Sequence, residues 1–254
     1  MLDVRDLGFG FGARHVGSGI SFTLDAGETL AVLGGNGAGK TTLFRTLLGL
    51  LPLQAGSLTI GGAELAKLAP HERARRLAYV PQHHAPAFGF SVLEAVLMGR
   101  ASHLGAFARP GRDDFAAAHA ALATLGIDVL AKRRVTEISG GERQLVMLAR
   151  AIVQEAPVLV LDEPTASLDF GNRVRVLAEI DRLRAHGMTI LFSTHEPDQA
   201  LAHADRALLL ADGRALALDR VERALTAANI ERLYGTPVRL VKLDTRRYAC
   251  VPSA

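Results

Sequence analysis

The amino-acid sequence predicts an α/β fold built on a mainly parallel sheet. Three short apolar segments, residues 29–33, 158–161 and 189–193, are bounded by turn signals, as expected for buried strands. Helical patterns lie between and after these segments, and strands that alternate with helices favour parallel pairing. The chain has 254 residues and is 49% hydrophobic, which is enough for a sizeable core and excludes a disordered chain.

The expected elements run from a strand-rich start to a mostly helical middle. Strands are expected at residues 2–7, 20–24, 29–33, 57–62, 77–80, 158–161 and 189–193. Helices are expected at residues 40–50, 92–99, 113–125, 142–155, 171–186 and 197–204. The boundaries rest on turn and breaker residues, among them Asp25–Glu28, Pro52 and Pro81.

Residues 84–149 differ from their surroundings because helical patterns replace the strands there. We therefore expect one domain over residues 1–240, with a helical subdomain at about 84–149 inserted into the sheet domain. Residues 241–254 are expected to form a C-terminal tail without an assigned role. Within that tail, residues 242–248 fit either a strand or a disordered end.

The composition excludes several classes of protein. The N-terminus carries Asp3 and Asp6 where a secretory signal would be basic and then apolar, and no apolar run is long enough to span a membrane. The single cysteine, Cys250, excludes a disulfide scaffold and fits a reducing compartment. The net charge of +3 is small and the basic residues are scattered, so no nucleic-acid partner is expected.

A glycine-rich segment between an apolar strand and a helix is the strongest functional signal. Its residues are Gly34, Gly35, Asn36, Gly37, Ala38, Gly39, Lys40, Thr41 and Thr42, which match the pattern GxxxxGK[ST]. Glycines let backbone N–H groups turn inward around phosphate oxygens, and the start of a helix favours the same anion. Lys40 is expected to reach the β- and γ-phosphates, and the Thr41 hydroxyl to help hold Mg²⁺.

Two acidic residues follow the apolar strand at 158–161. Asp162 suits a direct or water-bridged contact with Mg²⁺, and Glu163 suits a base that polarises the attacking water. Alone, two acids in a turn at a strand end would more often be structural. The phosphate-binding pattern earlier in the chain makes the catalytic interpretation the stronger one.

The segment Ile138–Gln144 supports two compatible interpretations. Ser139 and Glu142 have the spacing of a helix capping box, in which each side chain accepts from the other residue's backbone N–H. A capped helix start with Gly140 and Gly141 is also an anion site. Because the chain has one phosphate loop of its own, the anion read by this second helix start must come from elsewhere.

Together these motifs resemble the nucleotide-binding subunit of an ATP-binding cassette (ABC) transporter, over about residues 2–240. Residues 34–42 resemble its Walker A loop, residues 139–142 its signature, and residues 158–163 its Walker B strand with the catalytic acid. The resemblance implies a RecA-like P-loop core, an antiparallel β subdomain and a helical insertion. It also implies ATP and Mg²⁺ as cofactors, and ATP hydrolysis as the activity.

Four further residues match the family one by one. Gln82 resembles the Q-loop glutamine that touches Mg²⁺ and the attacking water, and His195 resembles the switch histidine that senses the γ-phosphate. Asp169 resembles the end of the D-loop, which meets the partner subunit, and Phe11 lies where the family stacks an aromatic ring on adenine. Taken singly, Gln82, His195 and Phe11 would more often be structural residues.

The signature of this chain differs from the usual family sequence at two positions. Glu142 stands where the family most often has Gln, which adds a negative charge near the incoming phosphate unless capping turns the side chain back toward its own helix. Ile138 replaces a commoner Leu, which changes little. Lys40, Asp162 and Glu163 are all present, so neither departure removes the expected chemistry.

The resemblance also implies partners and a location. Two copies would face each other head to tail, with ATP between Walker A of one and Ser139, Gly140 and Gly141 of the other. Hydrolysis would open this homodimer and pass the motion to integral-membrane permease subunits. The expected location is the cytoplasmic face of the plasma (inner) membrane, as a peripheral subunit, with a periplasmic or surface substrate-binding protein as an indirect partner.

Several segments are similar in sequence to the ATP-binding subunits of importers of iron chelates, haem and cobalamin. These segments are residues 82–86, 96–100 and 110–114, whereas residues 195–200 look more like molybdate and tungstate members of the same branch. An exporter subunit is a further alternative. The pair His83–His84 has no further ligand spacing around it, so a metal site there is not expected.

Overall fold

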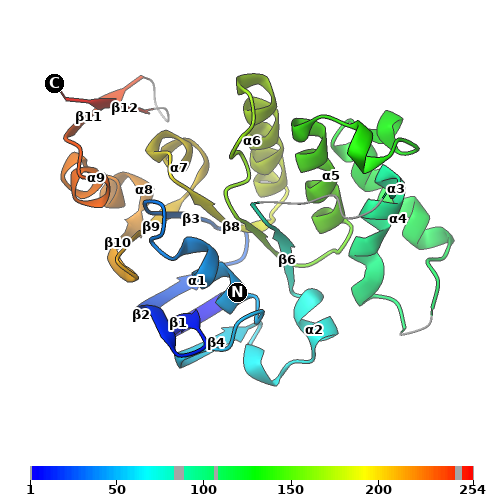
Figure 1. Cartoon of the computed structure of the whole chain (residues 1–254), viewed down its shortest axis with the longest axis horizontal. Coiled ribbons are helices and arrows are strands. Elements are labelled where there is room, and N and C mark those ends of the chain that lie inside the picture. Colours follow the sequence, from blue (N-terminus) through cyan, green and yellow to red (C-terminus); the bar gives the residue numbers. More distant parts are fainter. Residues whose placement is uncertain (1, 83–88, 106–107, 244–247, 254) are drawn as a thin grey trace. The chain divides into compact units, whose positions relative to one another are not determined.

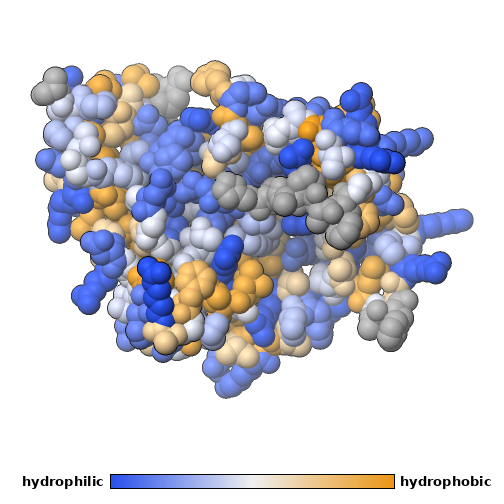
Figure 2. Space-filling model, viewed as in Figure 1, coloured by the Kyte–Doolittle hydropathy of each residue, from blue (hydrophilic) through white to orange (hydrophobic). Residues whose placement is uncertain are grey.

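The computed structural model describes residues 2–82, 89–105, 108–243 and 248–253. The chain divides into two compact units, one formed by Met1–Leu68 with Arg184–Ala254 and the other by Ala69–Leu183. None of the helices in the described ranges is long and apolar enough to cross a membrane. On the face shown in Figure 2, small hydrophobic patches are interspersed among hydrophilic residues.

The first unit begins with an antiparallel sheet, drawn in blue in Figure 1. Its strands are β1 (Leu2–Phe11), β2 (Arg14–Leu24), β4 (Ala55–Ile60) and β5 (Ala63–Glu64), in the order β2-β1-β4-β5. Side chains of β2 alternate between buried and exposed from Gly19 to Leu24, as expected for a sheet with one face on the core. This sheet matches the antiparallel β subdomain that the sequence resemblance implies.

The same unit holds strands β3 (Thr29–Leu33), β8 (Thr189–Thr194), β9 (Arg206–Ala211) and β10 (Arg214–Arg220). Strand β3 pairs in parallel with β8 and β9, and β10 pairs antiparallel with β9. All residues of β3 and β8 are buried, which explains the consecutive apolar residues at 30–33 and 190–192. Helix α1 (Lys40–Leu47) follows β3, and helix α7 (Pro197–His203) follows β8.

The C-terminal part of the first unit adds two short helices and a hairpin. Helices α8 (Val221–Ala224) and α9 (Ala227–Tyr234) precede strands β11 (Val238–Lys242) and β12 (Tyr248–Pro252), which pair antiparallel. The backbone N–H of Cys250 in β12 donates to Asp198 of α7 at 2.7 Å. The tail is therefore strand on both sides of residues 244–247, which lie outside the described ranges.

The second unit combines a parallel strand pair with helices. Strand β6 (Leu77–Val80) pairs in parallel with β7 (Val158–Leu161), and the helices are α2 (Pro70–Ala74), α3 (Val92–Leu97), α4 (Arg112–Thr124), α5 (Gly140–Ile152) and α6, which begins at Phe170 and ends at Ala185. Helices α3, α4 and α5 pack against one another through buried side chains such as Val96, Leu122 and Leu145. The predicted α/β fold class is therefore confirmed.

Element boundaries differ from the expectations where capping and turns decide them. Helix α1 ends at Leu47, not near Leu50, because the chain turns at Gly49 with a φ of +67°. Helix α5 begins at Gly140, two residues earlier than expected, because Ser139 caps it. Strands β9 and β10 were not predicted, and the boundaries 84–149 for a helical subdomain remain a prediction.

Candidate functional site

The glycine-rich loop connects β3 to α1 and encloses the side chain of Lys40. This lysine is 6% exposed, and its Nζ donates to the carbonyl oxygens of Gly34 at 2.6 Å and Gly35 at 3.2 Å. The loop therefore holds the ammonium group in place through its own backbone. Thr42 is buried behind it and Thr41 is half-buried, while Asn36 at the tip is exposed.

Two glycines are required by the conformation of this loop. Gly37 and Gly39 have φ values of +81° and +101°, which side chains rarely adopt. Gly39 directly precedes α1 and has no side chain with which to cap it. The start of α1 is thus not capped by a side chain, and a helix start of this kind favours an anion, as the sequence pattern predicts.

The switch position His195 lies at the same edge of the sheet as the glycine-rich loop. Strands β3 and β8 run parallel with Leu33 opposite Thr194, so Gly34 and His195 each follow directly after paired residues. His195 is exposed. Thr194 fixes the turn after it, because its Oγ1 donates to Gln199 at 2.9 Å and accepts from the N–H of Glu196 at 3.0 Å.

Phe11 ends strand β1 with its ring 44% exposed. Neighbouring Phe9 is completely buried, so the two phenylalanines of this strand have different environments. An exposed ring on a rigid strand is suited to stacking on a planar base. The sequence prediction for Phe11 is compatible with this placement and is not tested by it.

The second unit brings the predicted acids and the Q-loop glutamine together. Strands β6 and β7 pair with Val80 opposite Leu161, so Gln82 and Glu163 lie side by side just beyond the strand ends. Gln82 Nε2 donates to Glu163 Oε2 at 3.0 Å. Asp162 is completely buried, and the Tyr79 hydroxyl donates to its Oδ2 at 3.4 Å.

The backbone at the end of β7 is strained in a way that the sequence analysis did not predict. Glu163 has a φ of +45° and Ser167, in the D-loop, has a φ of +62°. Residues other than glycine reach this left-handed region at a cost, and such strain gathers at functional sites. In this backbone conformation the Glu163 carboxylate accepts the hydrogen bond from Gln82.

The predicted capping box at the start of α5 is confirmed. Ser139 Oγ accepts from the N–H of Glu142 at 3.2 Å, and Glu142 Oε2 accepts from the N–H of Ser139 at 2.8 Å. The backbone N–H of Ser139 is the main cause that lowers the pKa of Glu142. The extra negative charge of this signature is therefore turned back onto its own helix, while Ser139 and Gly140 are exposed.

Asp169 caps the start of α6. One carboxylate oxygen accepts from the backbone N–H of Asn172 at 2.8 Å, and the other accepts from Asn172 Nδ2 at 2.9 Å. Asp169 itself is exposed, so it remains accessible at the end of the D-loop. The role of Asn172 was missed, because nothing in the local sequence distinguishes it from other helical asparagines.

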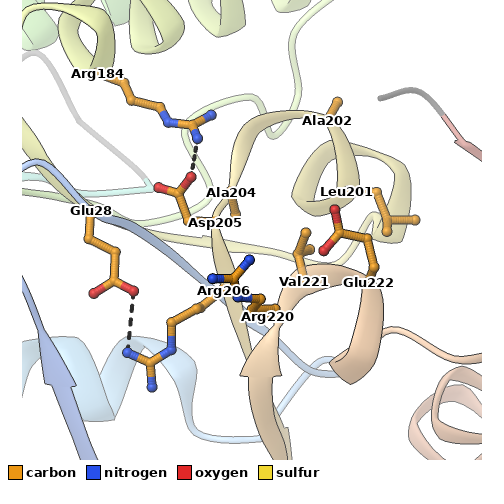
Figure 3. A pocket seen from close by; sticks show the side chains of 10 residues that line it. All are labelled: Glu28, Arg184, Leu201, Ala202, Ala204, Asp205, Arg206, Arg220, Val221 and Glu222. Carbon is orange, nitrogen blue, oxygen red and sulfur yellow. Dashed lines mark hydrogen bonds and ion pairs between the residues drawn. The ribbon is translucent and has the colours of Figure 1, made fainter. Parts of the chain in front are cut away.

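A pocket of about 440 Å³ in the first unit, shown in Figure 3, is a different feature. It lies beside Glu28 and Asp205, which precede β3 and β9, so it is at the opposite strand ends from Gly34. Its charged side chains satisfy one another, because Arg184 pairs with Asp205 and Arg206 pairs with Glu28 at 3.3 Å. The pocket therefore carries balanced charge and does not resemble a nucleotide site.

The candidate residues thus gather in two groups, one in each unit. The first group comprises Phe11, residues 34–42 and His195, and the second comprises Gln82, residues 139–142, Asp162, Glu163 and Asp169. No cluster of three or more His, Cys, Asp or Glu side chains suited to a metal occurs among the residues described. His83 and His84 lie outside the described ranges.

Comparison with known proteins identifies the family of the chain. Residues 18–166 match the ABC transporter family. An uncharacterized ABC transporter ATP-binding protein of Haemophilus influenzae is 40% identical over 95% of this chain and 92% of its own length. A protein of Helicobacter pylori named a probable iron chelatin transport ATP-binding protein is 34% identical over 97% of both chains.

A solved structure extends the likeness to the whole fold. It is described as an inward-facing conformation of a metal-chelate type ABC transporter, and it is 35% identical with a TM-score of 0.87. The superposition covers 100% of this chain and 97% of the other. The RecA-like P-loop fold that the sequence resemblance implies is therefore confirmed. The chain belongs to the ABC transporter family, as an ATP-binding subunit that hydrolyses ATP.

Proposed function

We propose that the chain powers an importer of an iron chelate, haem or cobalamin. One observation supports the ATPase activity most strongly. Gln82 donates a hydrogen bond to Glu163, and Glu163 follows the buried Asp162 directly after strand β7. The direction and the substrate class are supported by relatives. Besides the iron chelatin relative, a hemin import ATP-binding protein of Myxococcus xanthus is 37% identical over 95% of this chain.

In this proposal the backbone of the glycine-rich loop and Lys40 bind the phosphates of ATP. The positive end of the α1 helix dipole favours the same phosphates, and Phe11 stacks on the adenine ring. Glu163 accepts a proton from the attacking water, which Gln82 helps to orient. His195 senses the γ-phosphate from its exposed position after β8.

The proposal includes a Mg²⁺ ion bound together with ATP, as the sequence resemblance implies. Mg²⁺ prefers oxygen ligands and keeps few protein contacts in nucleotide sites, where phosphates complete its shell. The Thr41 hydroxyl, the Asp162 carboxylate and the Gln82 side-chain carbonyl are such donors. Complete burial of Asp162 at the end of β7 is consistent with a charge that a cation compensates. When bound, the ion would polarise the phosphoryl oxygens.

We further propose that two copies bind two ATP molecules between them. Ser139 and Gly140 are exposed at the start of α5, and the Ser139 hydroxyl and the Gly140 N–H are suited to a phosphate of the second copy's nucleotide. The dimer would dock on integral-membrane permease subunits from the cytoplasmic side, with an external substrate-binding protein as an indirect partner. No nucleic-acid partner is proposed.

A molybdate or tungstate importer is the second candidate. A molybdate import ATP-binding protein of Haemophilus influenzae is 38% identical over 93% of this chain and 89% of its own length, which is comparable to the relatives named for iron. The segment 195–200 also favoured this branch. The relatives named for import do not support the exporter alternative, and recovery of an exporter permease with the tagged protein would contradict the import proposal.

Cellular metal content separates these candidates. Glu163→Gln in the native host, grown under metal limitation, is expected to lower iron or cobalt selectively, as measured by elemental mass spectrometry. A selective fall in molybdenum or tungsten would favour the second candidate. Unchanged content of all four elements, with the variant protein present at normal amount, would contradict metal-linked import and direct the work to efflux.

A further inference from the structure

The start of α6 and the start of α5 are in direct contact in the second unit. Gly141 is buried, and the side chain that covers it is that of Asn172, which approaches so closely that a Cβ at Gly141 would overlap its amide group. Only a residue without a side chain allows this approach. The second glycine of the signature is therefore shaped to accept Asn172 of the same chain.

The same asparagine holds the end of the D-loop. Both carboxylate oxygens of Asp169 accept hydrogen bonds from Asn172, one from its backbone N–H and one from its Nδ2. The side chain of Asn172 thus touches Gly141 on one side and binds Asp169 on the other. Asn172 is half-buried and is attached to both segments. A shift of Asp169 is therefore expected to move the start of α5, and a shift of the start of α5 to move Asp169.

Helix α6 also acts on the start of α5 through charge. The pKa of Glu142 is lowered first by the N–H and hydroxyl of Ser139, and further by the positive charges of Arg133 and Arg175. Arg175 lies on α6, one turn after Asn172, and its Nη2 donates to the carbonyl oxygen of Leu125 at 3.2 Å. Helix α6 therefore contacts the start of α5 through Asn172, and Arg175 adds a favourable charge one turn later.

We propose that Asn172 is a positioning residue that joins Asp169 to the start of α5, so that both segments meet the second copy of the chain in one arrangement. The proposal rests on the ATP-held dimer proposed above. Ser139, Gly140 and Asp169 are exposed around this buried contact. We call this link between Asp169 and the start of α5 through Asn172 the bridge. It would let the signature and the D-loop engage the partner's nucleotide together.

Dimer formation tests the bridge. In a Glu163→Gln background, which should hold ATP without hydrolysing it, the dimer dissociation constant is measured with MgATP by sedimentation. Asn172→Ala is expected to weaken the dimer about tenfold, the size of one lost hydrogen bond to a charged group. Affinity of the single chain for a fluorescent ATP analogue is expected to stay unchanged, because Lys40 and its loop are untouched.

The chain contains a matched control. Asn229 is the third residue of α9, as Asn172 is of α6, and its backbone N–H donates to Thr226 while its Nδ2 donates to Ala224 at 2.9 Å. Asn229→Ala removes a comparable hydrogen bond away from both motifs. It is expected to change thermal stability without nucleotide about as much as Asn172→Ala, and to leave the dimer constant within twofold of the parent.

A second variant keeps the test decisive if Asn172→Ala is unstable. Asn172→Asp preserves the size of the side chain against Gly141 but cannot donate to Asp169, and it is also expected to weaken the dimer. A dimer constant equal to the parent's for either Asn172 variant would overturn the bridge alone. A Glu163→Gln parent that stays monomeric in MgATP would overturn the dimer first, and the bridge with it.

Discussion

At the scale of single residues, the account depends on how Glu163 is presented. Its φ of +45° is strained, and its carboxylate receives a hydrogen bond from Gln82. A carboxylate held in this way is oriented before substrate arrives, which avoids part of the cost of ordering it during the reaction. The residue before Glu163 is held in place at the end of the strand, because the N–H of Asp162 donates to the carbonyl of Val80. The surrounding structure can therefore maintain the strained conformation of Glu163.

Glu163→Gln is expected to lower the ATP hydrolysis rate about 10²–10⁴-fold, because an amide cannot accept the proton of the attacking water. Phosphate release measured under saturating MgATP checks this. Nucleotide binding should persist. Glu64→Gln, which alters an exposed pair with Lys67, serves as the control and should hydrolyse ATP at the parent rate. A Glu163→Gln rate near that of the parent would contradict the role of this carboxylate.

Phe11→Ala is expected to weaken binding of ATP about twofold to tenfold, because aromatic stacking contributes about 0.5–1.5 kcal/mol. Isothermal titration calorimetry with a non-hydrolysable ATP analogue checks this. Phe115→Ala is a matched control, since Phe115 on α4 is 43% exposed against 44% for Phe11. Equal affinities for the two variants would remove Phe11 from the nucleotide site.

At the scale of elements, the C-terminal end of α5 is clamped by an ion-pair cluster. Arg100, in the turn after α3, donates to Asp114 of α4 at 2.9 Å and to the carbonyl of Val153 at 3.0 Å. It also pairs with Glu155 at 2.8 Å. A Cβ at Gly99 would meet the backbone of α5, so the turn packs directly on that helix. The clamp fixes one end of α5 while the capping box fixes the other.

The clamp predicts a pH dependence of stability. The pKa of Asp114 is lowered by its bond to Arg100 and by the N–H of Gly111. A lowered pKa in the folded chain stabilises it above the ordinary Asp value of about 3.9, and this stabilisation is lost as the pH falls through the lowered value. Asp114→Asn should therefore unfold at lower urea concentration than the parent at pH 7, with the difference shrinking below about pH 3.

Asp113→Asn is the control for this experiment, because Asp113 is the exposed neighbour of Asp114 on α4 and has no part in the clamp. Its urea midpoint should follow the parent at both pH values. A difference between Asp114→Asn and the parent that is as large in acid as at pH 7 would show that the hydrogen-bond geometry, and not the charge of Asp114, provides the stabilisation.

The parts that the sequence predicted well are those whose signal is local. The phosphate loop, the buried strands at 29–33 and 158–161 and the capping box at Ser139 each depend on a few consecutive residues. Strand β10 was missed because its alternation of arginine, alanine and leucine is weak and none of its residues is buried. The contact of Asn172 with Gly141 was missed because tertiary packing alone creates it.

At the scale of the whole molecule, we propose that ATP holds two copies of this chain together and that hydrolysis through Glu163 separates them. The residues proposed to meet a partner, Ser139, Gly140 and Asp169, are exposed. In the proposal, their ligand is the nucleotide of the other copy. If two copies associate in this way, the mass of the particle in solution increases when ATP binds. A mechanism with a single chain would leave the mass unchanged.

Sedimentation of the Glu163→Gln protein in MgATP and in MgADP tests this claim most directly. The account predicts a dimer in MgATP and a single chain in MgADP, because only the γ-phosphate completes the contacts to the second copy. Lys40→Ala combined with Glu163→Gln should remain a single chain in both. The same mass in MgATP and MgADP, with ATP binding demonstrated in the same sample, would contradict the account.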